Sequence, residues 1–349
     1  MMESMLREWG GETVLVRYDR PTGAWTFIAI HSTHLGPATG GTRMKSYPNV
    51  EAALQDALRL AAGMTYKIAV PGLPYGGGKA VIDIPPDLDS ESRLALLRRH
   101  GALIYQLGGL FLTGPDVGTS SADMDIIAET GAPYIFARTP PAGGAGSSGP
   151  FTALGVFTGI QVACERVFGG LSLEGRRVLI QGTGSVGGSL IEHLRAAGAS
   201  VVFTEVDEGA IHHFRDVVGL EFVRPEEAYG TACDVFAPCA LGGILNANTI
   251  PQLKCRAVAG GANNQLADPR DAESLHARGI VYAPDFVINS GGALAILGLE
   301  TQGWTRARAE REVAETIRRA LGQILEVAAA QGITTEAAAS QIAEERLSG

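Results

Sequence analysis

The sequence has few cysteines among its 349 residues and no long uncharged apolar run. No window keeps roughly 18 uncharged apolar residues together, and no basic segment followed by an apolar stretch opens the chain. We therefore expect neither membrane spanning nor export, and we expect a cytoplasmic location. The 4 cysteines form no Cys-x-x-Cys pair, so free thiols are favoured over a disulfide framework.

Clusters of one charge are absent as well. The 28 basic and 37 acidic residues give a formal net charge of -9 and are dispersed along the chain, so nucleic acid is not an expected partner. Of the 7 histidines, His31 and His34 lack a third ligand, and His212 and His213 are neighbours on a predicted helix. No metal site is expected.

The length exceeds what one core usually fills, which predicts two domains. In the first part, strand-like runs flank a turn at residues 19–23, and helix-length segments follow Asn49 and Asp89. This part is therefore predicted to be α/β. Its expected strands are Val14–Val16, Thr26–Ile30, Lys67–Val70, Ala80–Ile84 and Leu110–Thr113.

A segment rich in proline, glycine and serine, Pro140–Pro150, is the strongest break in composition, and we place an interdomain hinge near it. Beyond it, short apolar runs alternate with helix-length segments, which predicts a doubly wound parallel sheet. The expected domains are residues 1–140 plus about 325–349, and residues 141–324. The strands expected in the second domain are Val178–Gln181, Ser200–Thr204, Val235–Pro238, Ala257–Gly260 and Ile280–Ala283.

A glycine-rich turn joins the predicted strand Arg177–Gln181 to a helix. Its Gly-x-Gly-x-x-Gly spacing permits close approach of a pyrophosphate to the backbone at a helix N-terminus. The next strand ends at Glu205, where a carboxylate would bind the ribose hydroxyls of NAD and repel the 2′-phosphate of NADP. The alternatives are a turn that binds nothing and an ordinary surface carboxylate. The turn residues expected to contact NAD are Gly182, Gly184, Ser185, Val186 and Gly187.

Two lysines, Lys67 and Lys79, lie in apolar or glycine-rich surroundings. Removing an ammonium group from water is costly, so each lysine either has a task or is solvated at a strand end. Asp116 directly follows an apolar strand, where α/β proteins tend to present functional side chains, although a turn-capping aspartate is the alternative. Asn263 lies in a glycine-rich turn and either contacts a ligand or forms an ordinary Asn turn.

Six segments resemble the Glu/Leu/Phe/Val dehydrogenases in order and spacing, over nearly the whole chain. They are Gly36–Arg43, Gly63–Lys67, Gly76–Lys79, Asp116–Thr119, Ala237–Gly242 and Ala262–Leu266. The resemblance implies an N-terminal α/β domain for substrate binding and oligomerisation, a Rossmann-type doubly wound NAD-binding domain, and a cleft between them. It also implies a homo-oligomer that deaminates an L-amino acid to the 2-oxo acid, ammonium and NADH.

The resemblance assigns roles to single residues. Lys67 would bind the substrate carboxylate, with Gly40, Gly41 and Met64 lining the same recess. Lys79 would be the base that activates water, which requires burial or a neighbouring positive charge, such as that of Lys67, to lower its pKa. Asp116 would be the second acid/base. Positions that match cofactor contacts are Thr152, Ala240 and Asn263, the last of which would also meet the substrate.

The substrate itself is expected to be L-phenylalanine. The segments Thr113–Asp116 and Gly143–Ser148 look most like phenylalanine dehydrogenases of actinobacteria, and small residues at side-chain positions would open space for an aromatic ring. Thr39 departs from the aliphatic or alanine residue of that pattern, and a leucine or valine dehydrogenase is the alternative. The positions expected to meet the substrate side chain are Thr39, Gly114, Pro115, Ala293, Leu294 and Ile296. None is a cation, as glutamate would require.

Two interpretations lie outside this family. A non-catalytic NAD-binding protein could keep the fold, but it would have little reason to keep Lys67, Lys79 and Asp116 together. A hydroxy-acid dehydrogenase would need a histidine base at a strand end beside the site, and no histidine lies at such a position in the sequence.

Overall fold

The computed structural model describes residues 2–348 and divides the chain into two compact units. Unit 1 comprises Met1–Ser147, Ile296–Gly303 and Arg346–Gly349, and unit 2 comprises Ser148–Ala295 and Trp304–Glu345. The chain first passes from unit 1 to unit 2 between Ser147 and Ser148, which lie inside the segment Pro140–Pro150 where a hinge was expected.

The C-terminal bounds of the units differ from the expected domains, because most of residues 325–349 belongs to unit 2. Helix α11 (Arg306–Gln331) packs against helix α5 (Gly149–Phe168) of that unit. The hydroxyl of Thr335 also donates to the Tyr282 carbonyl at 2.6 Å. Only the last residues join unit 1, where Arg346 Nη1 donates to the Ala69 carbonyl at 2.8 Å.

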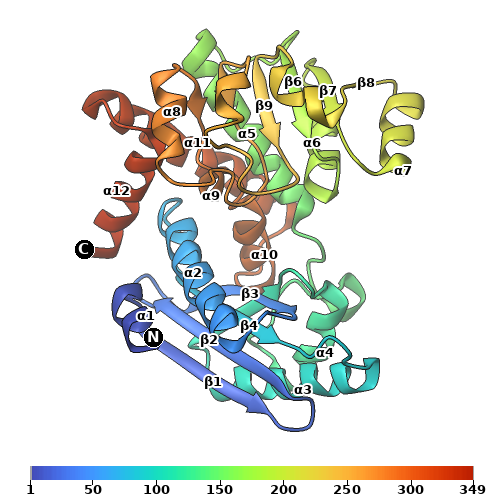
Figure 1. Ribbon diagram of the computed structural model, residues 1–349, viewed down its shortest axis with the longest axis vertical. Helices are drawn as coiled ribbons and strands as arrows, with labels where there is room; N and C mark the ends of the chain where they lie inside the picture. The colour runs from blue at the N-terminus through green and yellow to red at the C-terminus, as the bar shows by residue number, and fades with distance from the viewer. Residues whose placement is uncertain (1, 349) are drawn as a thin grey trace. The chain divides into compact units, whose positions relative to one another are not determined.

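Unit 1 is built on a mixed sheet of the strands β1 (Thr13–Asp19), β2 (Ala24–Ser32), β3 (Ala38–Lys45), β4 (Gly76–Asp83) and β5 (Phe111–Pro115). Their order is β1-β2-β4-β3-β5 (Figure 1). β2 is antiparallel to β1 and β4, whereas β3 is parallel to β4 and β5. The turn predicted at residues 19–23 is confirmed, and it joins β1 and β2 as a hairpin. The helices of this unit are α1 (Met2–Trp9), α2 (Val50–Ala69), α3 (Ser90–Gln106) and α4 (Ser121–Gly131).

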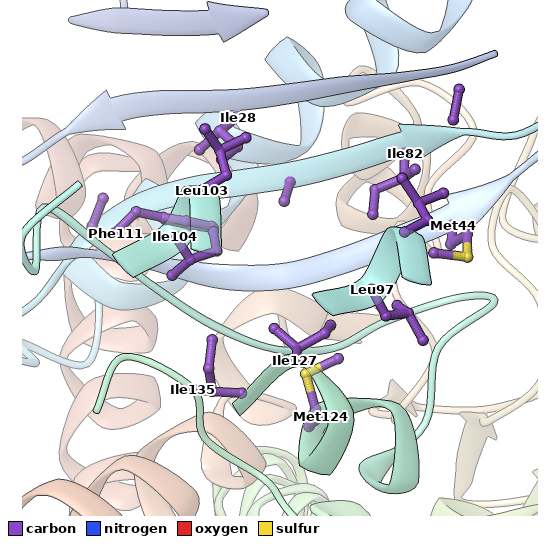
Figure 2. Packing of buried hydrophobic residues seen from close by; sticks show 14 of the residues in the cluster. Ile28, Met44, Ile82, Leu97, Leu103, Ile104, Phe111, Met124, Ile127 and Ile135 are labelled. Carbon is purple, nitrogen blue, oxygen red and sulfur yellow. The ribbon is translucent and has the colours of Figure 1, made fainter. Parts of the chain in front are cut away.

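The two faces of this sheet carry different helices. Phe27 and Val81 pack with the apolar residues of α2. Their chain neighbours Ile28 and Ile82 point to the other face, which α3 and α4 cover, as Figure 2 shows. Side chains alternate between the faces of a strand. The same alternation therefore decides which functional side chains share the α2 face.

Helix α2 is longer than the sequence predicts. The run Lys67–Val70, predicted as a strand, contains its last turn, so that prediction is wrong. Thr65, Ile68 and Ala69 continue the helical pattern of buried positions, and the helix ends just before Pro71. Lys67 thus lies at a helix end, and Lys79 lies within β4 instead of at a strand end.

Unit 2 contains a parallel sheet of order β11-β10-β9-β6-β7-β8. The predicted strands are confirmed, the last two in shorter form. The strands are β6 (Arg177–Gln181), β7 (Ser200–Thr204), β8 (Glu221–Phe222), β9 (Val235–Pro238), β10 (Ala257–Val258) and β11 (Val281–Tyr282). Besides α5 and α11, the helices are α6 (Ser185–Ala196), α7 (Glu208–Ile211), α8 (Asp271–Ala277), α9 (Asp285–Ile288) and α12 (Thr335–Ser348), while α10 (Gly291–Thr301) belongs partly to each unit.

Among residues 2–348, α5 is the one helix long and apolar enough to cross a membrane by length and composition alone. Of the most apolar 18-residue window of this helix, 56% is buried inside the structure. It packs against α6 and α11. These contacts are those of a central helix in the core of unit 2.

The N-terminus of α2 offers a test of the fold. The Asn49 side chain accepts a hydrogen bond from the Ala52 amide at 2.8 Å. We predict that Asn49→Ala lowers the free energy of unfolding of unit 1 by about 1 kcal/mol, because one helix amide loses its partner. Urea unfolding measures the loss, and Asn49→Asp is the control that keeps the cap. Equal stability of Asn49→Ala and the wild type would contradict this account of the helix end.

Candidate active site

Lys79 is a buried lysine on the α2 face of the sheet in unit 1. It is 4% exposed, and Val81, two residues further along β4, packs into the apolar core beneath α2. Its ammonium group forms an ion pair with Asp116 Oδ2. Burial lowers the pKa of Lys79 below its ordinary value, although the Asp116 carboxylate acts in the opposite direction.

Asp116 follows the end of β5 and lies between two cations. Its Oδ1 accepts a hydrogen bond from Arg43 Nε at 2.7 Å, while Oδ2 contacts Lys79. Burial alone would raise the pKa of Asp116, but Lys79 and Arg43 outweigh it and lower the pKa to about 2. Asp116 is therefore a carboxylate at neutral pH. Its contact with Lys79 is direct, so a proton can pass between the two groups without an intervening water.

Arg43 connects this ion pair to helix α2. Its Nη1 donates to Asp56 Oδ2 at 2.9 Å, and the same oxygen accepts a hydrogen bond from the Tyr47 hydroxyl at 2.7 Å. Arg43 also lowers the pKa of Lys79, an effect that the sequence analysis expected from Lys67. Sequence reasoning missed Arg43 and Asp56 as site residues. The available signal was the position of Arg43 at the end of the segment Gly36–Arg43, which carries part of the family resemblance.

Glycines bring α2 unusually close to the sheet. A Cβ atom added to Gly77 would lie 2.1 Å from the Thr65 amide nitrogen on α2. One added to Gly40 would lie 1.9 Å from the Gly78 carbonyl oxygen and 3.4 Å from Met64 Cγ. Only glycine fits at such approaches. The structure thus brings Met64 over Gly40, and Lys67 follows one turn later in α2, partly buried.

The other predicted strand residues lie on β3 and β5, the strands that lead to Asp116. Gly41 pairs with Gly114 across β3 and β5, and a Cβ atom on Gly41 would lie 2.8 Å from Asp116 Cβ. Thr39 is 1% exposed, and its hydroxyl has no hydrogen-bond partner among the described residues. Pro115 is partly buried. Of the remaining predicted side-chain positions, Ile296 belongs to unit 1, and Ala293 and Leu294 belong to unit 2.

A buried hydrogen-bond chain supports the loop that carries Asp116. The Asp116 amide donates to Thr119 Oγ1 at 2.9 Å, and that hydroxyl donates to the Thr42 carbonyl at 2.7 Å. Thr42 Oγ1 in turn contacts His100 Nε2 on α3 at 3.1 Å. Burial, with a smaller contribution from Arg17, lowers the pKa of His100 to about 4. His100 is therefore neutral at pH 7.

In unit 2, the glycine-rich turn between β6 and α6 has the form that the sequence predicts. Gly182 has a φ of +94°, and a Cβ atom on Gly187 would lie 2.0 Å from the Gly182 carbonyl oxygen. Gly184 is the exposed N-cap of α6, and no side chain caps this end. Ser185 and Val186 begin the helix. Uncapped amides at a helix N-terminus can bind a pyrophosphate, so these residues fit a dinucleotide.

Glu205 follows β7 and is tied to this turn. Its Oε2 accepts hydrogen bonds from the Thr183 amide at 2.7 Å and from the Thr183 hydroxyl at 2.9 Å. Burial opposes ionisation of Glu205, but these and neighbouring amide hydrogen bonds outweigh it and lower the pKa. Glu205 is therefore ionised at neutral pH and held beside the glycines.

The three other predicted cofactor residues also lie in unit 2. Ala240 lies against the turn, since its Cβ would be 2.6 Å from a Cβ atom added to Gly182. Thr152 is in the first turn of α5, and Asn263 Oδ1 accepts a hydrogen bond from Asn289 Nδ2 at 3.0 Å. Across residues 2–348, no three His, Cys, Asp or Glu side chains gather as a group that could hold a metal ion.

Comparison with known protein families now identifies the group to which this site belongs. Residues 14–132 match the dimerisation domain of Glu/Leu/Phe/Val dehydrogenases, and residues 143–222 and 205–348 match the model described as Glutamate/Leucine/Phenylalanine/Valine dehydrogenase. The chain belongs to the Glu/Leu/Phe/Val dehydrogenase family. It is an amino-acid dehydrogenase, and the predicted family, fold class and enzyme class are confirmed.

Three relatives illustrate the range within this family. The leucine dehydrogenase of Geobacillus stearothermophilus is 45% identical over 96% of this chain and 90% of its own. The valine dehydrogenase of Streptomyces albus is 42% identical over 97% and 92%. The crystal structure of L-tryptophan dehydrogenase from Nostoc punctiforme has a TM-score of 0.85 and 40% identity, and it covers 100% of this chain and 98% of that chain. These relatives support the leucine/valine alternative better than the phenylalanine assignment.

The histidine beneath the active site gives this dehydrogenase a testable pH dependence. The pKa of His100 is lowered from 6.5 to about 4, so the unfolded chain binds this proton more tightly. Stability is therefore lost as the pH falls from 6.5 to 4, by about 3 kcal/mol from this group. We predict that His100→Asn, which cannot titrate, removes that part of the loss, as urea unfolding at pH 7 and pH 4 would measure. Parallel pH profiles for the two proteins would refute a neutral buried His100.

Proposed function

We propose that the protein catalyses the reversible, NAD-dependent oxidative deamination of a branched-chain aliphatic L-amino acid, such as L-leucine or L-valine. The observation that carries the proposal is the buried Lys79–Asp116 ion pair beside Gly41 and Gly114. The substrate class is supported by the leucine and valine dehydrogenases among the relatives.

The residues of unit 1 divide the work. Lys67, at the end of α2, binds the substrate carboxylate, and Gly40, Gly41 and Met64 line the recess beside it. Because Gly41 has no side chain, the substrate α-carbon can approach Asp116 closely. The positive charge of Lys67 and the rigid strands position the amino group for reaction.

Lys79 and Asp116 manage the protons. Asp116 is ionised and accepts a proton from the substrate ammonium group, which leaves a neutral amine able to release a hydride from the α-carbon. Lys79, once neutral, removes a proton from water, and that water attacks the resulting iminium carbon. Asp116 then returns a proton to the carbinolamine nitrogen, and ammonia leaves as the carbinolamine hydroxyl gives its proton to Asp116, which forms the 2-oxo acid. Burial of Lys79 and the charge of Arg43 both favour the neutral amine that this step requires.

The cofactor belongs to unit 2. NAD, when bound, would supply the acceptor for the hydride of the substrate α-carbon. We assign its pyrophosphate to Gly182, Gly184, Ser185, Val186 and Gly187, and its adenosine ribose to Glu205. Thr152, Ala240 and Asn263 would contact the nicotinamide end, and Asn263 would also contact the substrate.

The assembly and location are also part of the proposal. We propose a homo-oligomer, which the match of residues 14–132 to a dimerisation domain supports. We also propose a cytoplasmic enzyme, in keeping with the free thiols of Cys164, Cys233, Cys239 and Cys255.

The direct test is NADH formation at alkaline pH with L-Leu, L-Val, L-Phe, L-Trp and L-Glu. We expect the highest kcat/KM with L-Leu or L-Val. Lys79→Ala should lose at least roughly 100-fold in kcat, because it removes the base that activates water. The control is Lys45→Ala, which removes an exposed lysine that stacks on Tyr47. A preference for L-Phe would favour the earlier phenylalanine assignment, and no NADH from any amino acid would contradict the proposal.

Glu205 allows the cofactor to be tested separately. We predict that the wild type prefers NAD to NADP. Glu205→Gln should lower the ratio of kcat/KM with NAD to kcat/KM with NADP by roughly 10-fold or more, because a neutral amide no longer repels a 2′-phosphate. Asp207→Asn is the matched control, since that carboxylate caps α7 two residues away. An unchanged ratio in Glu205→Gln would remove Glu205 from the cofactor site.

A further inference from the structure

The space that Gly114 leaves open is already filled by an aromatic ring of the same chain. A Cβ atom added to Gly114 would lie 2.3 Å from Phe136 Cε2, 2.8 Å from Cδ2 and 3.0 Å from Cζ. Even the smallest side chain at this position would collide with the ring. From the sequence, the lack of a side chain at Gly114 was expected to leave room for an aromatic group of the substrate. In the structure, the ring of Phe136 fills that room.

This ring lies on the face of the sheet that carries the reacting groups. Gly114 lies near the end of β5 (Phe111–Pro115), and Asp116 follows that strand directly. Gly114 also pairs with Gly41, whose missing Cβ would point at Asp116. Thr113, between them in the chain, points to the opposite face and contacts Thr42 Oγ1 at 2.8 Å. Phe136 therefore covers Gly114, the residue paired with Gly41, on the face of β5 opposite to Thr113.

The backbone holds Phe136 in place on both sides. Its amide donates to the Thr113 carbonyl at 2.9 Å, which aligns it with β5. The next residue, Ala137, has a φ of +56°, a left-handed conformation that is uncommon for alanine. The Ala137 amide donates to Glu300 Oε1 at 2.9 Å, and the same oxygen accepts a hydrogen bond from the Ala145 amide at 2.7 Å. An unfavourable backbone conformation held by a carboxylate fixes where the ring lies.

We infer that Phe136 is a specificity-determining residue that shortens the pocket for the substrate side chain and excludes aromatic amino acids. The inference rests on the proposed function and specifies the substrate class of that site. Phe136 is only partly buried, so it can contact a ligand. A branched aliphatic side chain can end against the ring, whereas a phenyl or indole group would need the volume that the ring occupies.

The test measures kcat/KM for L-Leu and L-Phe in the wild type and in Phe136→Ala. We expect the Phe/Leu ratio to rise by roughly 10-fold or more in the variant, the range that one hydrophobic group in a pocket controls. Phe136→Leu, which preserves more of the packing, should raise the ratio by a smaller factor and serves if the alanine variant does not fold. A variant that folds, oxidises L-Leu and keeps the wild-type ratio would overturn the inference.

Tyr134→Ala provides the matched control. This ring lies two residues earlier in the same segment, but it packs over Gly109, 3.0 Å from a Cβ atom added there, and against Tyr105. We expect its removal to affect stability and to leave the Phe/Leu ratio unchanged. An equal rise of the ratio in Tyr134→Ala would assign the effect to general loosening and overturn the role of Phe136.

A double variant tests the contact itself. Gly114→Ala should lower kcat/KM for L-Leu, because its methyl group would collide with the ring. The loss should be smaller when Gly114→Ala is made in the Phe136→Ala background. Equal losses in both backgrounds would contradict the geometry. Absence of NADH formation by the wild type with every amino acid would instead refute the proposed function, so the two failures are distinct.

Discussion

The structure of unit 1 depends on the ion pair between Lys79 and Asp116, which is largely withdrawn from water. Taking two charges out of water is costly, and the cost is offset only where both are paired and hydrogen-bonded. Asp116 accordingly accepts a hydrogen bond from Arg43 on its second oxygen, and Arg43 also donates a hydrogen bond to Asp56 on α2. Each charge in this group has a partner. Loss of one partner would leave a buried charge uncompensated, so the contacts that stabilise unit 1 are the same ones that the proposed proton transfers require.

Both helical layers of unit 1 act on this pair. Above the sheet, glycines in β3 and β4 let α2 approach closely enough for Met64 and Thr65 to adjoin the strand residues, and Lys67 follows in the last turn of the helix. Below it, α3 supports the Asp116 loop through His100, Thr42 and Thr119. The groups that we propose to react therefore lie on strand β4 and on a hydrogen-bonded loop, and their geometry is set before a substrate binds, which is the arrangement that precise chemistry requires.

Sequence reasoning succeeded where the signal is local. The glycine turn before α6 follows from a short motif, and Lys79 and Asp116 were both named from the resemblance, although their direct pairing was not predicted. It failed where the cause is tertiary. Strand β3 has no alternating pattern because Gly40 and Gly41 replace side chains, and the end of α2 resembles a strand in the three apolar residues Ile68–Val70. Phe136 carries no motif, and its role depends on a neighbour 22 residues away in the chain. A small residue therefore indicates an open pocket only when no distant ring fills it.

The central claim is that Lys79 and Asp116 act as one unit. It is tested most directly by comparing kcat/KM for L-leucine in Lys79→Met, Asp116→Asn and the variant that carries both changes. Groups that act together are strongly non-additive, because either loss already removes the shared function. The account predicts that the double variant is about as impaired as the worse single variant. A double variant whose loss equals the product of the two single losses would contradict it and would make the two residues independent contributors.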